Sequence, residues 1–377
     1  MNIKKVLIAP DSFKGTISSP EVCRIIAGKF KELIPGVETI TIPIADGGEG
    51  TLECFLSAKE GKRVPLKVKG PWFEEMDAWY ALINGGRTAV VELAVCAGLP
   101  LAGDRKNPEL TTTYGVGQMM VHAAESGAGE ILVAIGGSCT NDGGCGFAAA
   151  AGVIFLDKEG KSFVPTGGTL LDISSIDAAG IHPAIKNVRI RVMCDVDNPL
   201  YGKNGAAYIF APQKGADGEM VRRLDKGLEN LAEKIKIFTG NDIGAMQGAG
   251  AAGGAGGGLA AFFGCSLESG IQIILDAAGF DELAKGCDFI LTGEGKLDSQ
   301  SLRGKVIDGV ASRAKPLGIP VIAVAGDIGE GYKEIYSRGV SAVVSTNRVA
   351  VPFEIAKERA KSDLADTIED LIRILKL

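Results

Sequence analysis

Two acidic turns place carboxylates where they could hold a metal ion or a hydroxyl group. Asp46 and Glu49 lie among three glycines within residues 46–51. Asp195 and Asp197 follow an apolar run. Because they are two residues apart, both side chains lie on the same side of an extended chain. Carboxylate oxygens bind Mg²⁺, and one of the second pair could act as a general base. The alternative for each segment is a tight polar turn, in which the acid only caps a helix or starts the turn.

The best candidate for a phosphate-binding loop is the segment GGSCTNDGG at 136–144. It follows the apolar run 131–135 and precedes an alanine-rich stretch, so we expect a strand, a glycine-rich turn and a helix start. Backbone N–H groups in such a turn can point at one bound anion. A turn capped by Thr140 or Asp142 would explain one or two of these residues but not the four glycines. The predicted phosphate contacts are Gly136, Gly137, Ser138, Thr140 and Asn141.

Two further polar segments supply cations next to expected strand ends. Asp11, Ser12 and Lys14 directly follow the first apolar run. Residues 292–305 contain three cations and two acids, and they also follow an apolar run. Ligands of α/β sheets bind at the carboxyl ends of the strands, where a lysine suits an anionic substrate. An ordinary solvated loop is the alternative for both segments.

The sequence gives little support for dinucleotide binding, histidine catalysis or nucleic-acid binding. Residues 248–253 match the dinucleotide pattern G-x-G-x-x-G, but no apolar strand precedes them and no acid follows at about twenty residues. That tract instead suits close helix packing or a backbone wrapped over a ligand. His122 and His182 lie outside the polar turns, which argues against histidine catalysis. The net charge of −6, without a polybasic run, argues against nucleic acid as a partner.

Alternating strands and helices must position these turns. Residues 6–9 form an apolar run, Ser18 and Pro20 signal a helix start, and residues 39–44 resemble a second strand. The alternation returns later in the chain, which predicts a parallel sheet covered by helices. The later predicted elements are a helix at 111–126, strands at 131–135 and 289–292, a helix at 306–314, and strands at 321–325 and 342–345.

Two regions interrupt this alternation. Residues 63–92 contain strand-like runs joined by Asn84-Gly85-Gly86, which predicts a hairpin turn. Residues 153–210 contain further predicted strands, at 190–193 and 207–210. Because 377 residues exceed one typical core, we assign both regions to a second domain inserted into the first.

The predicted fold class is therefore α/β with two domains. One is a parallel Rossmann-like (flavodoxin-like) sheet domain, and the other is an inserted mixed α/β domain. The expected boundaries are 1–62, 107–150 and 280–377 for the parallel-sheet domain, and 63–106 with 151–279 for the inserted domain.

The composition favours a cytoplasmic protein. The eight cysteines have no C-x-x-C spacing and suit small buried residues in a reducing compartment. The apolar run at 6–9 is too short for a signal peptide. Residues 243–267 carry no charge, but their glycine content argues against a membrane span, so we expect no membrane partner.

Seven motifs, taken in order, resemble the class I glycerate kinase family. The resemblance covers nearly the whole chain, and the order of the motifs is more specific than any one of them. The motifs are PDSFKG (10–15), DGGEGT (46–51), GGSCTNDGG (136–144), CDVDNPLYG (194–202), FAPQKGA (210–216), GAGAAGGAGGG (248–258) and LTGEGKLDSQSLRGK (291–305). The sequence departs from the family pattern at Cys139, where a small residue such as alanine is expected.

The resemblance implies ATP-dependent phosphorylation of D-glycerate in small-acid carbon metabolism, with Mg²⁺ and an active site in the cleft between two α/β domains. Class I enzymes usually act on the 2-hydroxyl group. The residues agree, because a small anion needs Lys or Arg and phosphoryl transfer needs cations and metal around the migrating group. Phosphorylation at the 2- or 3-hydroxyl, and a monomer or a homodimer, stay open alternatives.

Side-chain chemistry suggests how the roles divide. Asp195 or Asp197 would position the glycerate hydroxyl group, and Asp46, Glu49 and Asp195 would bind Mg²⁺. Lys14 is expected to take part both in catalysis and in binding the glycerate carboxylate. The expected catalytic residues are Asp195, Asp197, Lys14 and Lys296; the substrate-binding residues are Ser12, Lys14, Asp298 and Arg303; and Gly293 and Gly295 join the 136–144 segment at the ATP phosphates.

Other functions use some of the same features. A kinase for another small hydroxy acid would need the same cations and acids. An NAD-dependent dehydrogenase is suggested by the parallel sheet and the literal G-x-G-x-x-G. A non-catalytic two-domain binding protein could also close on a small anion, but it would leave the acidic pairs without a role.

Overall fold

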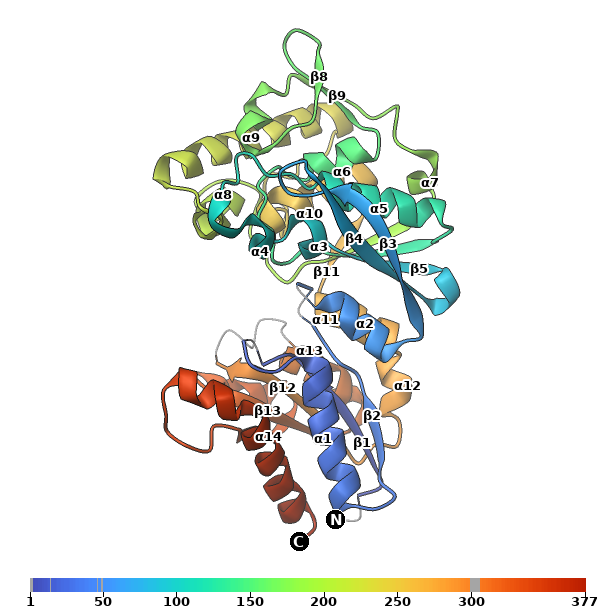
Figure 1. Cartoon of the computed structure of the whole chain (residues 1–377), viewed down its shortest axis with the longest axis vertical. Coiled ribbons are helices and arrows are strands. Elements are labelled where there is room, and N and C mark those ends of the chain that lie inside the picture. Colours follow the sequence, from blue (N-terminus) through green and yellow to red (C-terminus); the bar gives the residue numbers. More distant parts are fainter. Residues whose placement is uncertain (1–2, 14, 46, 49, 299–305) are drawn as a thin grey trace. The chain divides into compact units, whose positions relative to one another are not determined.

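The chain divides into two compact units, shown in the computed structural model of Figure 1. The structure describes residues 3–13, 15–45, 47–48, 50–298 and 306–377. Unit 1 contains Met1–Asp46, Glu53–Lys59 and Ile271–Leu377, and unit 2 contains Gly47–Leu52 and Glu60–Gly270. Most of unit 2 is thus a single long insertion in the chain of unit 1.

Unit 1 is built on a five-stranded parallel sheet with the order β14-β13-β12-β1-β2. Its strands are β1 (Lys5–Pro10), β2 (Glu38–Thr41), β12 (Phe289–Leu297), β13 (Val321–Ile328) and β14 (Val340–Ser345). Numbered within the unit, the order is 2-1-3-4-5, which is that of flavodoxin-like sheets. The prediction of a parallel flavodoxin-like sheet is confirmed.

The helices of unit 1 bury apolar faces against this sheet. In α1 (Ser19–Leu33), the buried residues Val22, Ile26 and Phe30 recur every four positions and share a core with β1, β12 and α14 (Phe353–Leu375). Figure 1 shows α1 and α14 packed side by side. The remaining helices are α2 (Thr51–Ala58), which begins in unit 2, α11 (Gly270–Ala278), α12 (Phe280–Ala284) and α13 (Val306–Ala314).

Unit 2 is built on a six-stranded mixed sheet with the order β11-β10-β6-β5-β4-β3. The first four strands are parallel, and β4 runs antiparallel to both β5 and β3. The strands are β3 (Gly61–Lys69), β4 (Glu75–Ile83), β5 (Thr88–Glu92), β6 (Glu130–Ala134), β10 (Arg189–Met193) and β11 (Ser266–Glu268). The predicted turn at Asn84–Gly86 joins β4 to β5 as a short 3₁₀ helix.

Helices and a small antiparallel sheet complete unit 2. The small sheet has the order β8-β7-β9. Its strands are β7 (Ile154–Leu156), β8 (Ser162–Phe163) and β9 (Ser175–Asp177). The helices are α3 (Ala94–Ala97), α4 (Leu99–Ala102), α5 (Tyr114–Glu125), α6 (Cys145–Ala150), α7 (Pro183–Lys186), α8 (Ala206–Phe210), α9 (Gly218–Thr239) and α10 (Ala251–Phe263).

The structure differs from the sequence-based expectation in two segments. Residues 107–150, assigned above to the parallel-sheet domain, lie in unit 2, because β6 pairs with β5 and β10 and with no strand of unit 1 among the described residues. Residues 207–210 lie in helix α8 instead of a strand, because a four-residue apolar run has too few residues to reveal its period. Of the described helices, none has both the length and the apolar character needed to cross a bilayer.

Candidate active site

The central strands of the unit 1 sheet, β1 and β12, end next to each other. Pro10 pairs with Gly293, and the backbone N–H of Asp11 donates to the Gly293 carbonyl oxygen at 2.8 Å. The strand order reverses between these two strands, which is where open α/β sheets bind ligands. The predicted substrate residue Ser12 lies at this point, and its N–H donates to the buried Asp11 carboxylate.

Lys296 and Asp298 lie farther along β12 and just beyond it. Their side chains form an ion pair of 3.8 Å, and 59% of the Lys296 side chain is exposed, so an anion in solution can reach it. Gly293 has a packing reason to be glycine, since an added Cβ would lie 2.3 Å from the Val324 carbonyl oxygen. Likewise, the Gly295 carbonyl oxygen lies 2.5 Å from an added Cβ on Gly326. Close strand packing therefore gives Gly293 and Gly326 a structural reason to be glycine.

In unit 2, residues 136–144 follow β6, and we call them the Gly136 loop. The N–H of Gly136 donates to the Gly47 carbonyl oxygen at 3.0 Å, and an added Cβ on Gly136 would lie 2.8 Å from Gly48 Cα. These two backbones can approach so closely only because both sides are glycine. Gly136 is half-buried and Gly137 exposed, whereas the rest of the loop is buried. The accessible part of the loop is thus its first two residues.

The other predicted phosphate contacts, Ser138, Thr140 and Asn141, are buried. Among the described residues, Thr140 Oγ1 and both polar atoms of the Asn141 side chain have no hydrogen-bond partner. The glycine tract of α10 covers this part of the loop, since an added Cβ on Gly253 would lie 2.0 Å from the Thr140 carbonyl oxygen. The side chains of Thr140 and Asn141 therefore do not face solvent in this structure.

Asp142 fixes the loop to two helices. Its buried carboxylate accepts bonds from Thr113 N and Thr113 Oγ1, each at 2.8 Å, and from the N–H groups of Gly144 and Gly146. Burial raises the pKa of Asp142, and these four donors oppose that rise because they favour the carboxylate. The bonds attach the loop to the starts of α5 and α6.

Lys214, which sequence reasoning did not select, holds the same loop from inside. It is 1% exposed, and its Nζ donates to Ser138 Oγ and to the Thr140 carbonyl oxygen, each at 2.7 Å. Burial lowers the pKa of Lys214 to about 8. A signal was present in the motif FAPQKGA, where the lysine is the one charged residue among small and apolar neighbours.

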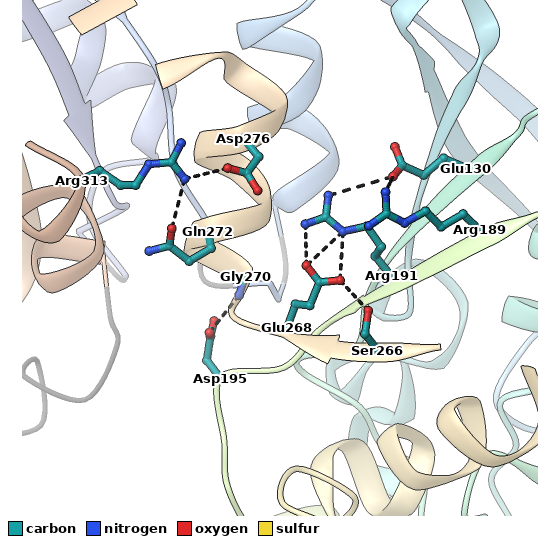
Figure 2. A network of polar contacts seen from close by, with 10 residues as sticks. All are labelled: Glu130, Arg189, Arg191, Asp195, Ser266, Glu268, Gly270, Gln272, Asp276 and Arg313. Carbon is teal, nitrogen blue, oxygen red and sulfur yellow. Dashed lines mark hydrogen bonds and ion pairs between the residues drawn. The ribbon is translucent and has the colours of Figure 1, made fainter. Parts of the chain in front are cut away.

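Asp195 and Asp197 follow β10 and are exposed. Figure 2 shows the Asp195 carboxylate directed at Gly270, whose N–H it accepts at 2.9 Å. An added Cβ on Gly270 would lie 2.8 Å from Asp195 Oδ2 and 3.5 Å from Gly47 N. The structure thus brings Asp195 close to the backbone that follows Asp46 in sequence.

An ion pair joins the two strands that lead to Asp195 and Gly270. Arg191 on β10 donates from Nε to both carboxylate oxygens of Glu268 on β11, each at 3.0 Å, and Ser266 also donates to Glu268 (Figure 2). The Arg191 side chain is 13% exposed, so this pair is only weakly screened by water. It locks the two strands whose ends carry Asp195 and Gly270.

Glu92 is a second residue that sequence reasoning missed. It ends β5, is buried, and its carboxylate accepts the N–H groups of Gly50 at 3.3 Å and Leu52 at 3.1 Å. A carboxylate at these positions stabilises the start of α2, because the first N–H groups of a helix have no partner within it. The acid directly after the apolar run 89–91 was the available signal.

Four of the predicted site residues, Lys14, Asp46, Glu49 and Arg303, lie outside the described residues. Within the described part of the chain, no group of three His, Cys, Asp or Glu side chains is arranged to hold a metal ion. Mg²⁺ does not require such a group, because it is commonly held by one or two carboxylates together with substrate phosphates.

Known proteins resemble this chain over nearly its full length. Residues 6–376 match the sequence model of the glycerate kinase family. A glycerate kinase of Bacillus subtilis (strain 168) is 40% identical over 374 residues, which cover 99% of this chain and 98% of that protein. A glycerate 2-kinase of Escherichia coli (strain K12) is 42% identical over 342 residues, which cover 90% of each chain.

The fold is shared as well. A crystal structure from Salmonella typhimurium LT2, named as a candidate glycerate kinase 2, matches with a TM-score of 0.89 at 38% identity, and it covers 100% of this chain and 99% of that one. The family match and the relatives named as kinases identify this two-unit α/β chain as a small-molecule kinase. This chain belongs to the glycerate kinase family.

Proposed function

We propose that the protein transfers the γ-phosphoryl group of ATP to the 2-hydroxyl group of D-glycerate. The observation that carries this proposal is the family match from residue 6 to residue 376, within which all seven motifs fall. The choice of the 2-hydroxyl group is supported by the relative from Escherichia coli named glycerate 2-kinase.

Phosphoryl transfer needs an anion site, and the Gly136 loop is our proposal for it. Gly136 and Gly137 are the accessible residues of that loop, and they follow β6 at the carboxyl edge of the parallel strands. The Gly136 N–H already donates to the Gly47 carbonyl oxygen, so we propose that the Gly137 N–H is the backbone donor to a phosphate oxygen at this edge. Lys296, Gly293 and Gly295 are proposed as further phosphate contacts, because the exposed Lys296 ammonium can pair with an anion.

The glycerate hydroxyl group needs an acceptor for its proton, and Asp195 is the better placed of the two candidates. Its carboxylate is held by the Gly270 N–H at 2.9 Å and by the locked ends of β10 and β11, so its position is fixed before substrate binds. Asp197 is exposed two residues later. The substrate carboxylate is proposed to bind Lys14 and Arg303, with Ser12 and Asp298 completing the substrate contacts.

Mg²⁺ fits the donor groups near Asp195. The Asp195 carboxylate and the backbone of Gly47, which follows Asp46, both lie near Gly270, and we propose that Asp46, Glu49 and Asp195 would supply hard oxygen ligands. When bound, Mg²⁺ neutralises charge on the phosphate oxygens. The protein residues orient the hydroxyl group, accept its proton and keep the anionic groups in line.

A dehydrogenase is a poorer explanation of the same sequence. The literal dinucleotide pattern at 248–253 packs against backbone: added Cβ atoms on Gly250 and Gly253 would lie 2.3 Å from the Pro199 and 2.0 Å from the Thr140 carbonyl oxygen. Gly250 and Gly253 are buried, and the chain segments packed against them leave no room for a pyrophosphate. No strand precedes this segment among residues 240–250.

The cellular setting follows from the thiols. None of the eight cysteines, all of which the structure describes, forms a disulfide, and six of them are buried, which suits a reducing compartment, so we propose a cytoplasmic enzyme. A monomer or a homodimer would serve the proposed reaction equally, and light scattering coupled to size exclusion distinguishes them.

An assay of ADP release with a panel of small hydroxy acids tests the proposed activity. We expect release with D-glycerate and much less with lactate, glycolate and L-glycerate, and ³¹P spectroscopy should identify 2-phosphoglycerate. Release with another acid but not with glycerate would leave a kinase of different specificity. A 3-phosphoglycerate product would reject only the choice of hydroxyl group.

A further inference from the structure

Lys214 is a buried cation without a carboxylate partner. It lies in the short 3₁₀ helix Pro212–Lys214, is 1% exposed, and forms no ion pair in the described part of the chain. The carboxylate whose charge acts on it, that of Asp142, already accepts four hydrogen bonds from other groups. An ammonium group left in this state loses its hydration without a compensating negative charge.

The two acceptors of Lys214 both belong to the Gly136 loop. Nζ donates to Ser138 Oγ and to the Thr140 carbonyl oxygen, each at 2.7 Å. An ammonium has three N–H groups, so one donor remains beyond these two bonds. Lys214 therefore spans the part of the loop that directly follows the accessible residues Gly136 and Gly137.

If Lys214 only anchored the Gly136 loop through hydrogen bonds, its side chain would not need a charge. A neutral amine retains two N–H groups, which is enough for the two acceptors observed, and buried ion pairs are often replaced by apolar residues without loss of stability. The positive charge is useful when an anion binds, because a buried cation attracts a nearby anion strongly through a medium of low dielectric constant.

We propose that Lys214 is a positioning residue for nucleotide binding, which holds Ser138 and Thr140 from the interior and supplies the positive charge that balances a phosphate at Gly136 and Gly137. This inference rests on the proposed function of the Gly136 loop. Lys214 acts through the loop and does not touch the reacting atoms.

The titration of Lys214 supports a role that depends on charge. Burial lowers its pKa to about 8, whereas Cys139 beside it has a pKa raised by burial to about 11 and stays neutral below that pH. The other acting charge is Asp142, and Lys106 packs against the neighbouring Gly215 through its backbone and Cβ. In the absence of ligand the amine loses its proton near pH 8, and a bound phosphate should favour the protonated form.

The test compares wild type with Lys214→Met, with Lys226→Met as the matched control, because Lys226 is exposed and pairs only with Glu229 among the described residues. Lys214→Met should raise KM for ATP at least tenfold and change KM for glycerate less than twofold, and Lys226→Met should change neither. In wild type, KM for ATP should rise between pH 7 and pH 9.5, and this rise should be absent in Lys214→Met. An unchanged KM for ATP in Lys214→Met, or the same pH profile in both proteins, would overturn the proposal.

A second measurement needs only the wild-type protein, in case Lys214→Met does not fold. Calorimetry of ATP binding at pH 8.5, without glycerate and in two buffers of different ionisation enthalpy, should reveal net proton uptake by the protein. Binding without proton uptake would contradict the role of Lys214 while leaving the kinase intact. A wild-type protein that neither binds ATP nor releases ADP would instead refute the proposed function itself.

Discussion

One oxygen of the Asp195 carboxylate accepts the Gly270 N–H, and the side chain is exposed. Asn at this position retains an acceptor for Gly270 but loses the negative charge that would take up a proton. Asp195→Asn should therefore reduce kcat by about 10²- to 10⁴-fold, the range of general base catalysis, while thermal melting stays within a few degrees of wild type.

Asp197→Asn is the matched variant for this prediction, because Asp197 is exposed two residues away. We expect it to retain more activity than Asp195→Asn when both are assayed at saturating ATP and glycerate. Near-normal turnover in Asp195→Asn would show that Asp195 is not a catalytic residue. A larger loss of activity in Asp197→Asn would assign the general base to Asp197 instead.

Lys214 should also make the free energy of unfolding depend on pH. Burial lowers its pKa from 10.5 to about 8 in the folded protein, so between these pH values the unfolded chain binds more protons than the folded one. The free energy of unfolding then increases with pH in this window. Urea unfolding at pH 7.5 and pH 10 should show wild type gaining stability relative to Lys214→Met, and a constant difference between the two proteins would contradict the lowered pKa.

At the scale of elements, the glycines of α10 decide how the Gly136 loop packs. Gly253 has φ +70°, and an added Cβ would lie 2.0 Å from the Thr140 carbonyl oxygen. Gly264 at the end of α10 has φ +63° but no atom within 4 Å of an added Cβ. Gly264→Ala should cost about 1–2 kcal/mol through backbone strain alone.

Gly253→Ala adds a steric clash to the same strain. We expect it to cost more than about 3 kcal/mol or to prevent folding, as measured by denaturant unfolding beside Gly264→Ala. Equal losses in the two variants would mean that the loop moves freely away from α10, and the buried state of Thr140 would then not be fixed by packing.

The strand ends were predictable from sequence because a buried apolar run followed by glycine or acid is a local pattern. Residues 6–9, 131–135 and 289–292 all lie in or overlap strands. The partner of a strand is not local, so β6 was assigned to the wrong sheet. Burial is not local either: Thr140 and Asn141 look like loop residues until α10 covers them, and Lys214 looks solvated until its two acceptors surround it.

At the scale of the whole molecule, ligand binding should stabilise the fold selectively. A ligand at one hundred times its Kd adds about 2.7 kcal/mol to the free energy of unfolding. Thermal melting should therefore rise by several degrees with ATP and Mg²⁺, and stay unchanged with NAD⁺ at the same concentration. A rise with NAD⁺ alone would favour the dehydrogenase over the kinase.

The adjacency of β1 and β12 has a consequence for synthesis on the ribosome. The two strands pair residue by residue, from Val6 with Phe289 to Pro10 with Gly293, although unit 2 lies between them in the chain. At ribosomal speed the wait between them lasts on the order of tens of seconds. The first β-α-β segment must therefore stay unaggregated, with one long side of β1 unpaired, until the last quarter of the protein emerges. We therefore expect a chaperone that covers the unpaired edge of β1 to increase the yield of folded enzyme, and slower synthesis without such a chaperone to lower it.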